Sequence, residues 1–328
     1  MKCCRVHRRY VLLLTACVNP GGMPFTALTD TDQRLHQYLD ALDFYLKETS
    51  LPIVFCENTG MDISSRYISA VRSGRLECLC FDGNHFDHAK GKGYGEALIM
   101  DYAFCHSQFL AHCEMVVKVT GRLKVENIDR LLSDNHCFLS PTLQTFPIQN
   151  GASLQASASQ QASASQFHID SSQQSSAPHL HIDSSQPTSA SQFHTEDFEE
   201  SSSQSLFPQM IDSRLVMAPH AFWLRDFLSR KEEINDTAGF YFEHLLLDAL
   251  YRCSRFAWFP FLHVPQIVGV SGTSGQPYLK DSPRRHPRSF MGDMLGGAVR
   301  FDRQRPCYKM PLYLQTIVFL MRVVCKLR

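Results

Sequence analysis

The sequence predicts an α/β fold with a mostly parallel sheet that is flanked by helices, and two observations indicate it. Short apolar runs of strand length alternate with amphipathic segments of helix length from residue 9 to about residue 130. Each apolar run is followed by turn-forming residues such as Pro, Gly, Asn and Thr. Such alternation favours parallel strands joined by helices, with any ligand at the carboxyl ends of the strands.

The first strand, helix and second strand follow one another directly. Residues 9–18 are the expected first strand, which is apolar from Tyr10 to Val18 and ends in a Pro-Gly-Gly turn, and residues 31–48 carry apolar side chains at helical spacing. Thr29 or Asp30 is the expected N-cap, because a short polar side chain can accept a hydrogen bond from the first helical turn. A second apolar run at 51–56 completes a βαβ unit.

The alternation continues along the chain. We expect a further strand, helix and strand at 76–81, 94–110 and 115–119. Beyond a long polar segment we expect a strand and two helices at 215–218, 221–230 and 240–253.

The N-terminus allows a second interpretation. Basic residues precede the first apolar run, as in a secretory signal, and residues 14–17 imitate a lipoprotein cleavage box. The run is only about eight or nine residues long, at the lower limit for a signal, and it is rich in Val and Leu. A buried strand is therefore favoured, and a surface lipoprotein with a repeat stalk is the alternative.

Composition argues against several classes of protein. The chain has 32 Lys and Arg and 32 Asp and Glu in 328 residues, so no net field favours nucleic acid as a partner. Its 12 cysteines lack the spacing of a zinc site or a disulfide scaffold, and we expect reduced thiols. No segment approaches the roughly 18 apolar residues of a membrane span. We expect a soluble or surface-attached protein.

Residues 151–205 differ in kind from the rest of the chain, because Ser, Gln and Ala dominate and imperfect repeats recur. The segment 165–173 is echoed at 181–186 and in part at 191–194. So few apolar residues cannot offset the entropy of ordering, which predicts a disordered low-complexity insertion at 146–208.

The insertion divides the chain into 1–145, 209–300 and a basic amphipathic tail at 301–328. Within the tail, 313–328 is apolar and closed by basic residues. This pattern suits an interfacial helix beside an anionic membrane, or equally a terminal helix docked on the protein.

The stretch 90–96 has three glycines and two lysines just before a helix. Free backbone N–H groups, the helix dipole and the ammonium groups could hold a diphosphate there. The stretch matches neither the P-loop pattern nor the Rossmann glycine fingerprint, so a plain glycine-rich loop is the alternative.

The strand at 115–119 runs into Thr120, Gly121 and Arg122. At a strand carboxyl end, Arg122 could pair bidentately with a phosphate, and Lys118 could add a second positive charge. A surface arginine after a turn is the alternative.

Two acidic positions follow the insertion. Asp212 and Arg214 stand close together just after it, and Glu243 precedes His244 at the start of an apolar helix. Glu243 and His244 could act as a general base and its partner, or could merely cap the helix.

A set of short motifs covers residues 10–140 and 210–280. The motifs are LTACVNP at 14–20, IVFCENTG at 53–60, GKGYGEA at 91–97, KVTGR at 118–122, DSR at 212–214, GFYFEH at 239–244 and VSG at 270–272. In these motifs the chain resembles a group of bacterial glycosyltransferases of lipopolysaccharide and capsular polysaccharide synthesis. The resemblance implies a Rossmann-like fold of the GT-A type, with a nucleotide-sugar-binding half at 1–145 and an acceptor and catalytic half at 209–300.

The resemblance also implies roles for individual residues. The nucleotide-sugar-binding residues that we expect are Thr15, Asn19, Glu57, Asn58, Lys92, Gly95, Lys118, Thr120, Gly121 and Arg214. The expected catalytic residues are Glu243, Asp212 and Arg122, with Glu243 as the base for the acceptor hydroxyl.

Metal dependence stays open at this point. Where better-known relatives carry a metal-binding Asp-x-Asp pair, this chain has residues 120–122 and no carboxylate. Arg122 and Lys118 could neutralise the leaving diphosphate in place of a metal. Alternatively, Asp212 could supply a ligand to Mn²⁺ or Mg²⁺.

The expected activity is transfer of a sugar from a nucleotide-sugar donor to a cell-surface glycan or lipid-linked glycan acceptor. We expect it in the cytoplasm or peripherally on the inner face of the cytoplasmic membrane. Another sugar-nucleotide enzyme on the same scaffold and an inactive surface protein are the alternatives.

Overall fold

The structure is a computed structural model, and it describes residues 10–134, 143–145, 147–148, 210–253, 255–256, 258–261 and 263–278. The predicted insertion, apart from residues 147–148, lies outside these residues, as does the predicted tail at 301–328.

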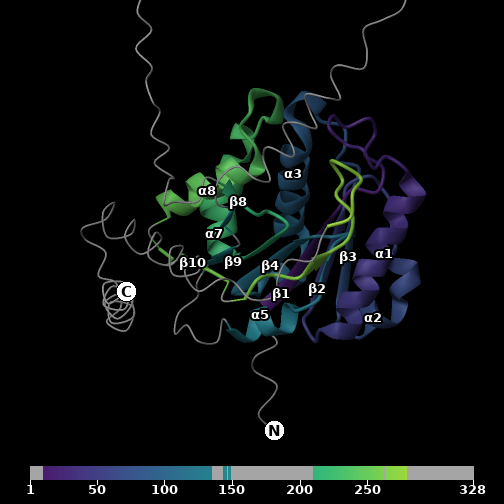
Figure 1. Cartoon of the computed structure of the whole chain (residues 1–328). Helices are drawn as coiled ribbons and strands as arrows, with labels where there is room; N and C mark the ends of the chain where they lie inside the picture. Colours follow the sequence, from purple (N-terminus) through teal and green to yellow (C-terminus); the bar gives the residue numbers. More distant parts are fainter. Residues whose placement is uncertain are drawn as a thin grey trace, which may run out of the picture.

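Seven strands form one mostly parallel sheet in the described part of the chain (Figure 1). In spatial order they are β10 (Trp258–Pro260), β6 (Leu143–Thr145), β9 (Leu215–Pro219), β4 (Met115–Thr120), β1 (Tyr10–Ala16), β2 (Ile53–Glu57) and β3 (Leu76–Cys80). Within this sheet β9 runs antiparallel to its neighbours β4 and β6, and the other neighbouring strands pair in parallel. The predicted Rossmann-like α/β architecture, a mostly parallel sheet flanked by helices, is confirmed.

The strand order reverses beside β1. The chain forms β1, β2 and β3 towards one edge, and the helix α3 (Gly91–His106) then leads it back to β4 on the other side of β1. The carboxyl ends of β1 and β4 therefore lie side by side, with Thr15 opposite Thr120. Open α/β sheets bind their ligands in crevices at such points.

Two short antiparallel pairs lie outside the main sheet. β5 (Lys124–Val125) pairs with β11 (Ile267–Val268), and β7 (Pro147–Ile148) pairs with β8 (Met210–Ile211). The strands β7 and β8 stand at the two ends of the predicted insertion. Since the closure entropy of a loop grows only slowly with its length, a pair of this kind can carry a long insertion at little extra free energy.

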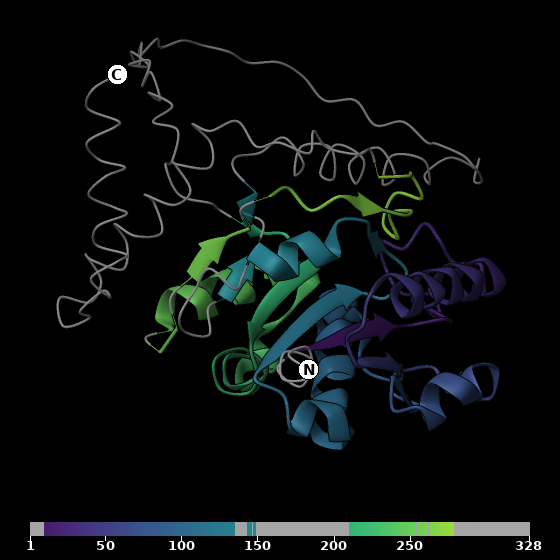
Figure 2. The same cartoon turned by 90° about the horizontal axis from the view of Figure 1, so that it is seen from below.

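Helices cover both faces of the sheet, and Figure 2 shows the purple helix α1 on the opposite side from α3. α1 (Thr31–Glu48) packs on one face with α5 (Ile128–Asp134), and α3 packs on the other face with α8 (Phe242–Arg252). The shorter helices and helical turns are η1 (Ser64–Tyr67), α2 (Ile68–Arg72), η2 (His88–Lys90), α4 (Gln108–Ala111), α7 (His220–Phe222), η4 (Trp223–Phe227), η5 (Leu228–Glu233) and η6 (Asp236–Ala238). None of the helices in the described ranges combines the length and the apolar character that a bilayer span requires.

The apolar run near the N-terminus is β1, as the strand interpretation predicted, and all of its residues are buried. Val11 and Leu13 pack in the core on the α3 side, and Leu12 and Leu14 pack in the core on the α1 side. Because helices cover both faces, the strand has a continuous apolar sequence and not an alternating one.

The predicted helix at 31–48 is confirmed at both ends, and Asp30 caps it through a hydrogen bond from the first turn. The single helix expected at 94–110 is instead two helices, α3 and α4. The Ser107 side chain accepts a hydrogen bond from the backbone N–H of Leu110, and this N-cap begins the second helix.

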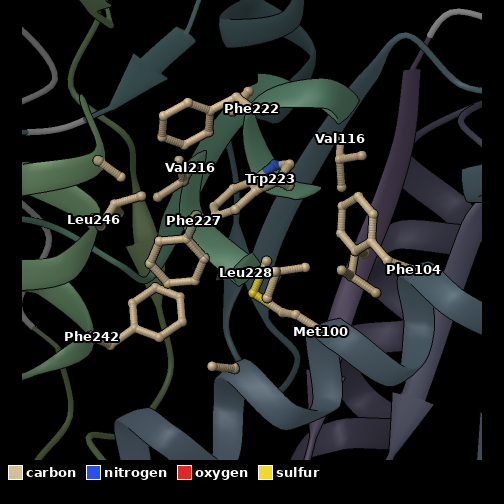
Figure 3. Close-up of a cluster of buried hydrophobic side chains, with 14 of the residues drawn as sticks. Met100, Phe104, Val116, Val216, Phe222, Trp223, Phe227, Leu228, Phe242 and Leu246 are labelled. Atoms are coloured by element: carbon tan, nitrogen blue, oxygen red, sulfur yellow. The ribbon is translucent and has the colours of Figure 1, made fainter. Parts of the chain in front are cut away.

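An aromatic cluster holds α8 against the sheet (Figure 3). The Phe227 ring contacts Trp223 and Phe242, with centroids 5.5 and 4.6 Å away. Trp223 and Phe227 belong to the succession α7, η4 and η5, which replaces the single helix expected at 221–230. Phe242 begins α8, so its packing also fixes the next residue, Glu243.

Candidate active site

A cavity of about 430 Å³ lies at the carboxyl ends of β1, β2 and β4. Its volume falls within the range of small-molecule sites. The strand ends, the first turns of α3, the η6–α8 segment and the loop at 272–278 line it. The cavity therefore stands at the point where the strand order reverses.

The ends of β1 and β4 form one side of the cavity. The Gly121 N–H donates to the Thr15 carbonyl oxygen at 2.9 Å, and a β-carbon at position 121 would lie 2.6 Å from that oxygen. Only glycine permits this close approach. Thr15, Thr120 and Arg122 line the cavity here, and with Arg214, which precedes β9, they form what we call the strand-end wall.

Protein oxygens hold the two arginines of this wall. Arg122 is 9% exposed, and its Nη1 donates to the Val270 carbonyl. Gly272 makes room for that guanidinium, because a β-carbon there would lie 2.5 Å from Nη2. Arg214 forms a bidentate ion pair with Asp212, at 2.9 Å for Nε–Oδ1 and 2.5 Å for Nη2–Oδ2. Both guanidinium groups are thus oriented without a ligand.

Asp212 is buried and lies outside the cavity lining. Both of its carboxylate oxygens accept hydrogen bonds from Arg214, whose guanidinium also lies over the Tyr278 ring, 4.4 Å from its centroid. In the structure Asp212 therefore positions Arg214.

Lys118 also lies outside the lining, in a buried polar network. Its Nζ is 2.6 Å from Glu96 Oε1 and donates to the Ser213 carbonyl at 2.6 Å. The same Glu96 oxygen accepts a hydrogen bond from the Thr15 hydroxyl at 2.8 Å. The Lys118 charge is therefore already paired with a protein carboxylate. Through Glu96, which accepts from Thr15, and through the Ser213 carbonyl, Lys118 holds the strand-end wall in place from outside the cavity.

Glu243 lines the cavity from the first turn of α8, and the Ser213 hydroxyl donates to its Oε1 at 2.5 Å. Burial raises the pKa of Glu243, and the Glu96 charge adds to this, whereas the Ser213 hydrogen bond and the Lys118 charge oppose it. A carboxylate with a raised pKa is a stronger proton acceptor, which suits a general base.

The glycine-rich start of α3 receives a carboxylate of the protein itself. Asp236 Oδ2 accepts a hydrogen bond from the Gly93 N–H at 3.2 Å. Gly91 has a φ of +83°, and a β-carbon there would lie 2.2 Å from the same oxygen. The Gly93 N–H, which was expected to bind a diphosphate, therefore donates to Asp236 instead.

Asp236 and Glu243 both line the cavity, and we call these two residues the carboxylate wall.

Lys92, between these two glycines, does line the cavity. Its ammonium donates to the Phe25 carbonyl at 2.9 Å and to the Thr273 hydroxyl at 2.6 Å, so it joins two loops. Burial lowers the pKa of Lys92, and the Asp236 carboxylate opposes that shift. An entering anion would stabilise this ammonium group.

Asn58 lines the cavity just after β2 and is 1% exposed. Its Oδ1 has no hydrogen-bond partner among the described residues, which marks a place for a ligand or a water molecule. The adjacent Glu57 is completely buried and accepts hydrogen bonds from the backbone of Val18, Thr59 and Met61. Glu57 thus fixes the loops after β1 and β2.

The loop after β1 is also held by Arg34 of α1. The guanidinium donates to the carbonyls of Cys17, Val18 and Leu28, and the Tyr38 hydroxyl accepts a hydrogen bond from the Cys17 N–H. Arg34 and Tyr38 both line the cavity. An amphipathic helix carries polar residues at many positions, so its sequence did not single them out.

The structure brings many of the predicted site residues together. Those that line the cavity are Thr15, Asn58, Lys92, Gly95, Thr120, Arg122, Arg214 and Glu243. Those outside the lining are Asn19, Glu57, Lys118, Gly121 and Asp212. Lining residues that the sequence analysis did not assign include Cys17, Arg34, Tyr38, Glu96, Ser213, Asp236 and Tyr278.

The residues described in the structure provide no group of three or more His, Cys, Asp or Glu side chains that could hold a metal ion. Arg214 engages both oxygens of Asp212, the ligand suggested for Mn²⁺ or Mg²⁺. No step below is assigned to a metal.

No known family's sequence profile matches the chain, and a comparison with curated proteins also gives no match. Among solved structures, the chain is similar to a Bacillus anthracis protein described as a glucose-1-phosphate thymidylyltransferase and solved with sucrose, at 9% identity and a TM-score of 0.38, covering 94% of this chain and 98% of that chain. It is also similar to residues 1–349 of TarS from S. aureus in complex with UDP, at 10% identity and a TM-score of 0.33, covering 94% and 69%. A third is core-mannan synthase A from Aspergillus fumigatus in its Mn/GDP form, at 9% identity and a TM-score of 0.35, covering 90% and 84%.

Proposed function

We propose that this protein is a nucleotide-sugar-dependent glycosyltransferase whose active site is the cavity between the strand-end wall and the carboxylate wall. The observation that carries the proposal is the presence, in one cavity, of the cations Arg122, Arg214 and Lys92 together with the carboxylate of Glu243. Cations suit the diphosphate of a donor, and a carboxylate suits the hydroxyl of an acceptor.

In this proposal the donor diphosphate lies against Arg122, Arg214 and Lys92. The nucleoside lies towards Asn58, whose unpaired amide oxygen can accept a hydrogen bond. Negative charge grows on the diphosphate as the bond to the sugar breaks, and fixed cations stabilise that charge without reorganising.

Glu243 acts as the general base. Its carboxylate takes the proton of the acceptor hydroxyl while the acceptor oxygen bonds to the anomeric carbon. The bond between that carbon and the phosphate oxygen breaks, and its electron pair leaves with the diphosphate. Positioned proton transfer of this kind contributes roughly 10² to 10⁴ in rate.

We further propose a hexose as the transferred sugar and a lipopolysaccharide or capsule glycan, free or lipid-linked, as the acceptor. The support is the set of short motifs, such as KVTGR at 118–122 and GFYFEH at 239–244. The basic, apolar sequence at 313–328 supports peripheral contact with the inner face of the cytoplasmic membrane.

The test is a binding screen of the purified chain against UDP, GDP, CMP, dTDP and their sugar conjugates, with and without Mn²⁺. A ligand that binds the native state raises apparent stability by mass action, so one nucleotide class should raise the Tm. Arg122→Gln and Lys92→Ala should each weaken that binding about tenfold or more, because each removes a charge-assisted hydrogen bond.

Arg72→Gln is the matched control, since Arg72 is an exposed arginine of α2 outside the cavity. It should leave nucleotide affinity unchanged. No stabilisation by any of these nucleotides, in a sample that circular dichroism shows to be folded, would refute the proposed function.

A further inference from the structure

We propose that Asp236 binds a hydroxyl group of the donor sugar and thereby determines which nucleotide sugars the cavity accepts. This inference rests on the proposed function and adds a specificity-determining contact to it. It concerns a residue of η6 that belongs to none of the sequence motifs.

The two oxygens of the Asp236 carboxylate have different surroundings. Oδ2 accepts a hydrogen bond from the Gly93 N–H, whereas Oδ1 is buried and has no hydrogen-bond partner in the described part of the chain. The residue lines the cavity and is 8% exposed. Native structures rarely leave a buried oxygen unpaired, so a ligand group or a water molecule is expected at Oδ1.

A tight loop holds Asp236 in this position. Asn235 and Phe240 exchange two backbone hydrogen bonds, at 2.8 and 3.0 Å, and the Asn235 side chain accepts one from the Ala238 N–H. On the other side, the absence of a side chain at Gly91 lets the carboxylate approach the helix start. Such a rigidly held acceptor is pre-organised for a ligand group.

The chemistry of the carboxylate selects the kind of ligand group. An ionised carboxylate only accepts hydrogen bonds, so a sugar hydroxyl can donate to Oδ1 but a phosphate oxygen cannot. Glu243 also lines the cavity, so an acidic sugar would meet like charges at the carboxylate wall. The site therefore favours a neutral sugar with a free hydroxyl over an acidic or deoxygenated one.

The donor sugar is the part of the ligand that reaches this oxygen. Lys92 is the chain neighbour of Gly93, which donates to Asp236, and Lys92 contacts the diphosphate in the proposed function. A sugar attached to the distal phosphate extends from there towards the carboxylate wall, where Glu243 receives the acceptor proton.

The experiment is calorimetric titration of the full chain with UDP and UDP-glucose, GDP and GDP-mannose, and dTDP and dTDP-glucose. Asp236→Asn should weaken the nucleotide sugar by about 10- to 100-fold, the range for a hydrogen bond to a charged group, and leave the matching nucleoside diphosphate unchanged. Glu233→Gln is the control, since Glu233 lies on η5, three residues before Asp236 in the chain, and outside the cavity.

Deoxy sugars of the same nucleotide identify the hydroxyl. In the unmodified protein, one deoxy analogue should bind more weakly by a similar factor, and in Asp236→Asn the same analogue should bind almost as well as the parent sugar.

Equal affinities of the parent protein and Asp236→Asn for both ligands would mean that Oδ1 only meets water. Equal weakening of both ligands would mean that Asp236 merely shapes the nucleotide site. Each outcome overturns this inference and leaves the proposed function standing. A folded protein that binds no nucleotide would instead refute the proposed function, and this inference with it.

Discussion

The strand-end wall and the carboxylate wall border the same cavity but are built by different means. Strand register positions the strand-end wall, since Thr15 lies opposite Thr120 in the β1–β4 pair and the Gly121 N–H donates to the Thr15 carbonyl. Side-chain packing sets the second, since Phe242 anchors Glu243 and a tight loop presents Asp236.

The bonding of the two walls differs as well. Arg122 and Arg214 already donate to protein oxygens, whereas Asp236 keeps one oxygen without a hydrogen-bond partner in the described part of the chain and Glu243 accepts a hydrogen bond from the Ser213 hydroxyl. Substitutions in the carboxylate wall should therefore change turnover and ligand binding more than the free energy of unfolding. Substitutions of residues that support the strand-end wall from outside the cavity, such as Lys118, should mainly lower the free energy of unfolding.

Glu243→Gln gives the largest expected effect. The amide keeps the shape of the side chain and its contact with Ser213 but cannot take the acceptor proton, so turnover should fall by about 10² to 10⁴. The Kd for the nucleotide sugar should stay unchanged. Steady-state kinetics and calorimetry measure both quantities, with Glu48→Gln on the exposed side of α1 as the control. Full turnover in the Glu243 variant would end its assignment as the base.

Lys118→Met tests the region behind the strand-end wall. Removing one partner of a buried ion pair costs about 3–5 kcal/mol, and the lower end applies because Glu96 keeps access to the cavity. The free energy of unfolding, from urea titration, should fall by about 3 kcal/mol. Adding Glu96→Gln to Lys118→Met removes the carboxylate that the first substitution leaves unpaired, so the double variant should regain part of the lost free energy of unfolding. The control is Lys47→Met, at an exposed lysine of α1, which should leave the free energy of unfolding almost unchanged.

Sequence patterns predicted the strand-end wall better than the carboxylate wall for a physical reason. Strand ends follow from apolar runs and turns, so Thr120 and Arg122 could be placed at the carboxyl end of a parallel strand before the structure was known, whereas Thr15 was assigned through the resemblance. The antiparallel β9, which brings Arg214 to the same edge, has no periodic signal that reveals its direction.

Side-chain orientation could not be read from the sequence. Lys118 and Arg122 both looked like phosphate ligands, yet the first lies in the buried network and the second lines the cavity. The glycines at 91 and 93 suggested a phosphate loop, but a carboxylate from a distant segment, Asp236, occupies the Gly93 N–H. Contacts between residues so far apart in the chain are set by the whole fold, and no local pattern encodes them.

Ser213→Ala should change the pH profile of turnover. Burial raises the pKa of Glu243, and the hydrogen bond from Ser213 opposes that rise. A base acts in its ionised form, so kcat/KM falls as pH decreases through this pKa, which lies above the ordinary glutamate value of about 4.3. Loss of the serine hydroxyl should raise the pKa further and move the acid limb to higher pH.

The control for this profile is Ser229→Ala, because Ser229 is an exposed serine on η5. An acid limb that stays in place, or moves to lower pH, in Ser213→Ala would contradict the role of Glu243 as the titrating base.

Tyr278→Leu gives the smallest expected effect and tests how Arg214 is held. The Arg214 guanidinium forms the bidentate pair with Asp212 and lies over the Tyr278 ring, 4.4 Å from its centroid. A cation–π contact at a partly exposed site is worth about 0.5–1 kcal/mol, so nucleotide affinity should fall by roughly two- to fivefold. Tyr278→Phe keeps the ring and should bind like the parent chain.

Calorimetric measurement of nucleotide affinity in both Tyr278 variants shows whether the Tyr278 ring helps to orient Arg214 in the strand-end wall. Equal affinity in the parent chain, Tyr278→Leu and Tyr278→Phe would show that the Tyr278 ring does not help to orient Arg214. A loss in both variants would point to the phenolic hydroxyl as the important group. A loss confined to Tyr278→Leu would mean that the wall depends on the stacked ring from the loop at 272–278 as well as on strand register.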